Sequence, residues 1–231
     1  MSTGFDPHPN GAAAREFVLS RIRKSLRDVP EIEKPEDVPI LRDYQQIETL
    51  SRTDVVELFI DRVVDYKATV TKVSSVGLPA AIASACAARG VKRLVVPADL
   101  PSGWVPAGVS ILRDPGLTID QLETSDGVLT GCAIGIAQTG TIVLDSGPAQ
   151  GRRILTLLPD YHLCVVREDQ IVGLVPEAVA KLGEAASGPG RPITFISGPS
   201  ATSDIELNRV EGVHGPRTLE VLVVVTSESR V

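Results

Sequence analysis

Two apolar runs predict β-strands and decide the fold: Pro192-Ile-Thr-Phe-Ile196 and Leu219-Glu-Val-Leu-Val-Val-Val225. The second run is almost wholly apolar, so we expect both of its faces to be buried, as in a parallel sheet. Between the two runs lies a polar stretch, Ser197-Gly-Pro-Ser-Ala-Thr-Ser-Asp-Ile-Glu206, followed by Gly212-Val-His-Gly-Pro216. Its two Gly-Pro pairs predict sharp bends, because glycine admits positive φ and proline fixes φ.

Upstream of this stretch, the chain alternates between strand patterns and helix patterns. Helices are expected at 53–66, 77–89, 118–123, 152–158 and 175–186. Strands are expected at 68–73, 92–97, 110–113, 127–137, 142–144, 162–166 and 170–172. Alternation of this kind predicts an α/β fold, with a mostly parallel sheet covered by helices on both faces.

The N-terminal part differs from this body. Residues 12–28 predict an amphipathic helix, in which Phe17, Ile22 and Leu26 are apolar among several arginines. Residues 29–44 contain three prolines and predict an extended linker. We therefore divide the chain into an N-terminal helix with its linker, 1–45, and an α/β domain, 46–231.

Composition limits the classes of function. Of 231 residues, 43% are hydrophobic but only 3% are aromatic, so the core must consist of Val, Leu, Ile and Ala. The net charge of −6 and the lack of a dense basic stripe argue against a broad nucleic-acid surface. No apolar run approaches the roughly 20 residues of a membrane span. The first ten residues lack a basic-then-apolar signal, so we expect a cytoplasmic protein.

The cysteines and the missing nucleotide motifs restrict the cofactors. Cys86, Cys132 and Cys164 are far apart and form no Cys-x-x-Cys pair, so we expect buried, inert thiols. A zinc site or a self-contained iron–sulfur site is not expected. Neither nucleotide-binding glycine fingerprint is present, which disfavours a nicotinamide cofactor. A flavin stays open because flavin sites need no single short motif, and the cofactor is therefore unknown.

The polar stretch supplies the candidate catalytic residues. Asp204 and Glu206 would share one face of a strand, and His214 titrates nearest neutral pH among the side-chain types. We therefore take His214, Glu206 and Asp204 as acid–base candidates. A structural alternative stays open, since Ser203-Asp-Ile-Glu206 also fits a helix capping box. His162 begins an apolar strand and is expected to be a core or edge histidine.

A second loop, Thr139-Gly-Thr141, offers two hydroxyls and exposed amides that suit a phosphate or a carboxylate, with Arg152 or Arg153 as the counter-charge. The alternative is a hairpin turn that needs Gly140 for its geometry. Because open α/β sheets bind ligands beyond the carboxyl ends of their strands, we expect this loop to face the 198–206 loop there. The expected ligand-binding residues are Glu123, Thr139, Gly140, Thr141, Gly198, Pro199, Ser200, Thr202 and Ser203.

Four segments in order resemble the LUD-domain family: Ala137-Gln-Thr-Gly-Thr-Ile-Val-Leu144, Leu158-Pro-Asp-Tyr-His-Leu-Cys-Val-Val166, and the 198–206 and 212–216 segments quoted above. The resemblance covers about Leu50 to Val225, and the N-terminal helical extension is compatible with it. It implies a three-layer α/β/α sandwich, similar to the sugar-isomerase and CoA-transferase type of fold.

The resemblance also implies a role in lactate utilization, in which three components together support the oxidation of L-lactate to pyruvate. Two of these components carry iron–sulfur motifs, and this chain lacks such cysteines. The implied function is a non-redox subunit that acts with iron–sulfur lactate utilization proteins. Two alternatives remain: an enzyme acting on a small phosphorylated or carboxylated substrate, and a binding or regulatory module for a small carboxylate.

Overall fold

The computed structural model describes residues 11–28, 34, 39, 41, 43–187, 190–202, 210–212 and 214–226. The chain forms two compact units, Met1–Tyr44 and Gln45–Val231, and each is described by itself. In the first unit, helix α1 (Gly11–Ser25) confirms the expected helix. Arg23 and Lys24 lie in its last turn, where basic side chains stabilise the negative end of the helix dipole. Most of the expected linker, 29–44, lies outside the described residues.

The second unit is built on a six-stranded sheet in which every neighbouring pair is parallel. In spatial order the strands are β1 (Thr69–Ser74), β12 (Thr218–Val225), β7 (Tyr161–Arg167), β4 (Gly127–Thr130), β2 (Arg93–Pro97) and β3 (Ser110–Asp114). The mostly parallel sheet predicted from the sequence is therefore confirmed.

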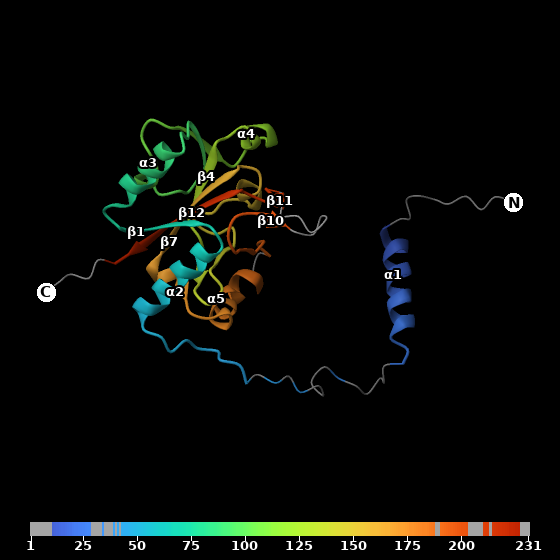
Figure 1. Cartoon of the computed structure of the whole chain (residues 1–231). Helices are drawn as coiled ribbons and strands as arrows, with labels where there is room; N and C mark the ends of the chain where they lie inside the picture. The colour runs from blue at the N-terminus through green and yellow to red at the C-terminus, as the bar shows by residue number, and fades with distance from the viewer. Residues whose placement is uncertain are drawn as a thin grey trace. The chain divides into compact units, whose positions relative to one another are not determined.

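Strands β7 and β12 form the middle of the core because their side chains are apolar on both faces. Leu163 and Leu222 point to the face covered by helix α3 (Leu78–Ala88). Cys164 and Val223 point to the opposite face, covered by helix α2 (Arg52–Asp65). Figure 1 shows α2 and α3 on opposite sides of this part of the sheet. The expected burial of the last strand on both faces is confirmed.

A second, four-stranded sheet also covers the α2 face. Its order is β8 (Ile171–Val172), β5 (Ile134–Ile136), β6 (Thr141–Leu144) and β9 (Thr194–Ile196). One side of this sheet packs with α2 and the main sheet, and the other side packs against helix α5 (Val175–Ser187). The predicted layers of helices are thus joined on one face by a layer of strands.

The second sheet corrects one expectation, the single strand at 127–137. This segment is two strands, β4 and β5, which belong to different sheets. The chain leaves the main sheet at Gly131, whose N–H donates to the carbonyl of Ala149 at 2.8 Å instead of continuing the ladder. This break could not be predicted from the sequence, because both strands are buried on both faces and together form one apolar run.

The remaining elements are short. They are helix α4 (Ile119–Glu123), the 3₁₀ turns η2 (Ser102–Trp104), η3 (Arg153–Thr156) and η4 (Glu168–Gln170), and the pair β10 (Ala201–Thr202) and β11 (Val210–Glu211). The helix expected at 152–158 is only the single turn η3. Gly151 before it has a positive φ, and Pro159 after it disfavours helical geometry at Leu158.

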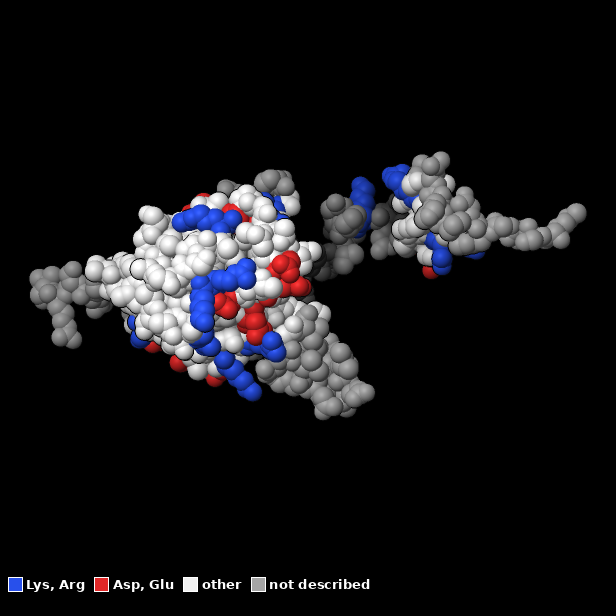
Figure 2. All heavy atoms as spheres, turned by 90° about the horizontal axis from the view of Figure 1, so that it is seen from above, with Lys and Arg blue, Asp and Glu red and all other residues white. Residues whose placement is uncertain are grey.

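The surface of the second unit carries mixed charge. On the face drawn in Figure 2, Lys and Arg side chains lie next to Asp and Glu side chains. Within the described part of the chain, no helix combines the length and apolarity needed to cross a membrane.

Phe59 tests this packing. Its side chain is 0% exposed on α2 and contacts strands of both sheets. Replacing it with alanine should cost about 3–5 kcal/mol of unfolding free energy, because a cavity opens between the two sheets. Val64→Ala, on the same helix at a position 49% exposed, should change stability by no more than about 0.5 kcal/mol. Urea denaturation measures both, and equal losses would contradict the described packing.

Candidate functional site

A pocket of about 220 Å³ opens beside the amino-terminal ends of β7 and β12. Four parts of the chain form it: β9 with the loop that follows, the turn η3, the start of β7, and the segment that leads into β12. The lining residues are Arg153, Thr156, His162, Thr194, Phe195, Ile196, Ser197, Gly198, Pro199, Ser200, Ala201, His214, Pro216 and Leu219. Two histidines, one arginine and several hydroxyls thus meet in one place.

Ser200 ties two of these parts together. Its N–H donates to the carbonyl of Pro216 at 2.8 Å, and its carbonyl accepts from the N–H of Gly212 at 3.1 Å. Its Oγ accepts from the N–H of His214 at 3.0 Å. The backbone amides of Ser200, Gly212 and His214 are therefore used within the protein. This network places the loop after β9 beside His214.

His162 lines the pocket from β7 although it is only 1% exposed. Its Nε2 lies 2.8 Å from the Oγ1 of Thr130 on the neighbouring strand β4. The expectation that His162 is a buried histidine with a hydrogen-bond partner is correct. Its position in the lining of a pocket was not expected. The signal in the sequence was a polar residue at the start of an otherwise apolar strand, next to a polar turn.

Two buried cysteines lie behind His162. The Sγ of Cys132 donates to the Oε1 of Gln170, and the Sγ of Cys164 donates to the carbonyl of Gly131, each at 3.7 Å. The neighbouring Cys164 and burial raise the pKa of Cys132, whereas Cys132, His162 and Thr130 lower the pKa of Cys164. Both thiols and that of Cys86 are free and buried, which confirms the expected burial. Among the described residues, no three His, Cys, Asp or Glu side chains are arranged to hold a metal ion.

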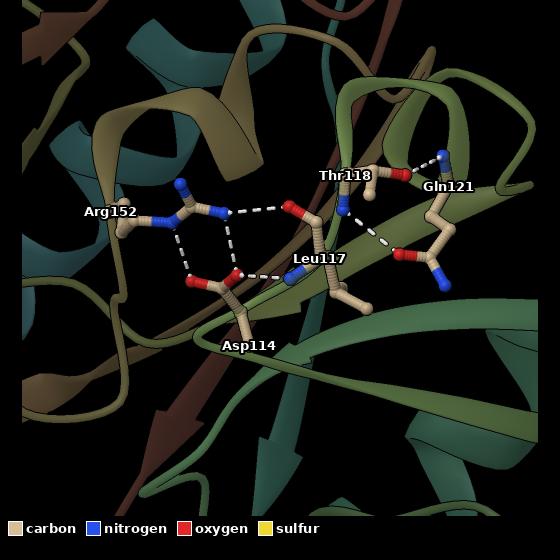
Figure 3. Close-up of polar contacts among 5 residues, drawn as sticks. All are labelled: Asp114, Leu117, Thr118, Gln121 and Arg152. Carbon is tan, nitrogen blue, oxygen red and sulfur yellow. Dashed lines mark hydrogen bonds and ion pairs between the residues drawn. The ribbon is translucent and has the colours of Figure 1, made fainter.

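Arg152 and Arg153, the two candidate counter-charges, point in different directions. Arg152 forms a two-pronged ion pair with Asp114, its Nε and Nη2 each 2.7 Å from a carboxylate oxygen, and it also donates to the carbonyl of Leu117. Figure 3 shows this arrangement beside the capping box of Thr118 and Gln121 that opens α4. Asp114 is 3% exposed, and its hydrogen bonds raise the pKa of Arg152.

Arg153, the next residue, turns into the pocket instead. It is half-buried, and its Nη1 donates to the Oγ1 of Thr156 at 3.0 Å. No carboxylate in the described part of the chain pairs with it, and burial lowers the pKa of its guanidinium. A half-buried cation without an acidic partner favours binding of an anion.

The Thr139–Thr141 loop touches the loop after β9, as expected, but does not line the pocket. The Oγ1 of Thr141 lies 2.7 Å from the Oγ of Ser197 and 2.7 Å from the Oγ1 of Thr139. Gly140 has φ +57°, and a Cβ there would lie 2.6 Å from the backbone of Arg62. These contacts support the alternative of a tight turn, packed here against the end of α2.

Only some of the other expected catalytic and ligand-binding residues line the pocket. Gly198, Pro199, Ser200 and His214 line the pocket together. Glu123 is exposed at the end of α4 and is not among the residues that line it. Thr202 lies in β10. Ser203, Asp204 and Glu206 lie outside the described residues, so their roles stay predictions.

The expected location at the carboxyl ends of the strands is corrected by the order of the chain. The turn η3 and the 214–216 segment immediately precede β7 and β12, so the pocket lies at the amino-terminal ends. A separate hollow of about 410 Å³ does lie at the carboxyl ends of β2 and β3, lined by Asp99, Asp114, Arg152 and the 146–148 loop. Both arginines of this hollow are paired with an aspartate, Arg152 with Asp114 at 2.7 Å and Arg191 with Asp145 at 2.8 Å.

Gly140→Ala tests the structural role of that turn. Gly108 also has a positive φ, but a Cβ there would meet no atom within 4 Å. Gly108→Ala should therefore cost only the backbone strain, about 1–2 kcal/mol, and Gly140→Ala clearly more. Thermal or urea unfolding of the two variants measures the difference. Equal costs would show that the turn is not packed as described.

Comparison with known proteins adds sequence and structural relatives. Residues 116–224 match the LUD domain. Lactate utilization protein C of Deinococcus radiodurans is 48% identical over 217 residues, 94% of this chain and 98% of that protein. The uncharacterized protein YkgG of Escherichia coli is 35% identical over 121 residues, 50% of this chain and 52% of that protein. A crystal structure of a DUF162 family protein from Deinococcus radiodurans superposes with a TM-score of 0.67 at 47% identity, covering 76% of this chain and 99% of that chain.

Proposed function

This chain belongs to the LUD domain family, and on this basis we propose that it is a cytoplasmic, non-redox component of an L-lactate utilization system. It acts with iron–sulfur partner proteins in the oxidation of L-lactate to pyruvate. The observation that carries this proposal is the similarity to lactate utilization protein C of Deinococcus radiodurans, which extends over nearly the whole of both chains.

The cysteine content supports a division of labour between components. A self-contained iron–sulfur cluster generally needs four cysteine ligands, and this chain has three cysteines in all. Cys86 and Cys132 belong to different core clusters, on opposite faces of the main sheet. Electron transfer is therefore assigned to the partners, and this chain contributes an accessory or ligand-binding role.

Deletion of the gene in its host should abolish growth on L-lactate while leaving growth on pyruvate unchanged, because only the step that produces pyruvate is lost. Re-expression of the full chain should restore growth. Growth curves on the two carbon sources measure this directly. Normal growth on L-lactate in the deletion strain would contradict the proposed role.

A second candidate function is that of a stand-alone enzyme or sensor for a small carboxylate or phosphorylated ligand. The half-buried Arg153, which has no acidic partner among the described residues, favours it. A thermal-shift screen against L-lactate, pyruvate, sugar phosphates, CoA, flavins and NAD tests it. A ligand at 100 times its Kd should stabilise the protein by about 2.7 kcal/mol. If no compound shifts the transition, this second function is contradicted.

A further inference from the structure

We propose that the pocket between η3, His162 and the 197–201 loop binds a small monocarboxylate with an oxygen on the adjacent carbon, and that Arg153 holds the carboxylate. This inference deepens the proposed function and rests on it for the choice of L-lactate and pyruvate as probes. The site itself is argued from the pocket's charge, hydrogen bonding and size.

The charge of the lining favours an anion. Among the described residues that line the pocket, Arg153 is the one Lys or Arg, and none is an Asp or a Glu. Holding a guanidinium half-buried costs free energy unless an acceptor satisfies it, and Thr156 accepts only one of its N–H groups. The planar fork of a guanidinium matches the two oxygens of a carboxylate. A carboxylate would therefore supply the missing partner.

The hydrogen bonding favours a carboxylate over a phosphate. Phosphate sites in proteins commonly use several free backbone amides, which form a concave cradle. Here the amides of two lining residues, Ser200 and His214, already donate to protein acceptors. The described lining residues supply one permanent positive charge, that of Arg153, which balances one carboxylate but not a phosphate dianion.

Two further groups suit an oxygen beside the carboxylate. The Oγ of Ser200 accepts a bond from His214 and keeps its own hydrogen to donate. The ring of His162 is held from behind by Thr130 and faces the pocket as a second polar group. Both groups line the same pocket as Arg153, so the second oxygen of a 2-hydroxy or 2-oxo acid held by Arg153 has polar partners there.

The size of the pocket suits a small acid. A volume of about 220 Å³ is below the roughly 300–1,000 Å³ of pockets that enclose drug-sized ligands. At about 30 Å³ per water molecule, it holds roughly seven waters. A three- or four-carbon acid fits this volume, whereas an acyl carrier or a dinucleotide would extend outside it.

Isothermal titration of the purified full chain with L-lactate, pyruvate, propionate and inorganic phosphate tests the proposal. L-Lactate or pyruvate should bind saturably, propionate more weakly because it lacks the second oxygen, and phosphate not at all. Arg153→Gln should weaken carboxylate binding at least tenfold. Arg62→Gln removes the same charge from an exposed position on α2 and should leave binding unchanged.

Arg153→Lys is a second variant, included in case Arg153→Gln fails to fold. It keeps the positive charge but loses the planar fork of the guanidinium. Its affinity for the carboxylate should fall between those of the wild type and Arg153→Gln. Absence of carboxylate binding, tighter binding of phosphate, or binding unaffected by both Arg153 variants would each overturn the inference.

The pocket proposal and the proposed cellular function can fail separately. A deletion strain that cannot grow on L-lactate, with no binding in vitro, contradicts the pocket alone, whereas binding in vitro with normal growth contradicts the cellular role alone.

Discussion

The burial of both faces of β7 and β12 is the constraint on which the rest of the second unit depends. Leu163, Val165, Val221 and Val223 are completely buried, and successive residues point to opposite sides of the sheet. Each side needs an apolar cover. Helix α3 supplies one, and α2 with the second sheet supplies the other. Burial of this apolar area is the main favourable term in folding.

The cover on the second face also builds the candidate site. Strand β9 is the edge of the second sheet, and its Ile196 packs against the same core cluster as α2. The chain then continues directly into Ser197–Ser200, so the packing of β9 against the core places that loop beside the beginning of β12. Ser200 completes the connection through its bonds to Pro216 and His214. The geometry of the pocket is thus a consequence of how the main sheet is covered.

The contrast between Arg152 and Arg153 explains why this end of the sheet is the better site for an anion. Both follow Gly151, which takes a left-handed conformation, and they extend in different directions. Arg152 is neutralised by Asp114 at the carboxyl ends of the strands, where the fold class would place a ligand. Arg153 enters the amino-terminal pocket with only the hydroxyl of Thr156 as a described partner. Charge compensation, rather than fold class, distinguishes the two hollows.

Much of this arrangement could be predicted from residue patterns. The parallel sheet followed from the alternation of strand and helix patterns, and the contact between the Thr139–Thr141 loop and the loop after β9 was also expected. Three features could not be predicted. The break at Gly131 is hidden in a continuous apolar run. The position of His162 beside a pocket depends on which loop covers the end of its strand. The different directions of Arg152 and Arg153 depend on the tertiary contact of Arg152 with Asp114. Asp204 and Glu206 remain predictions from the sequence alone.

The most direct measurement of the central claim is a crystal structure of the full chain grown with L-lactate or pyruvate. The expected result is a carboxylate within hydrogen-bonding distance of the guanidinium of Arg153, with its second oxygen directed toward Ser200 or His162. A ligand found instead in the hollow beside Asp99 and Asp114, with the amino-terminal pocket holding only solvent, would contradict the assignment of the site.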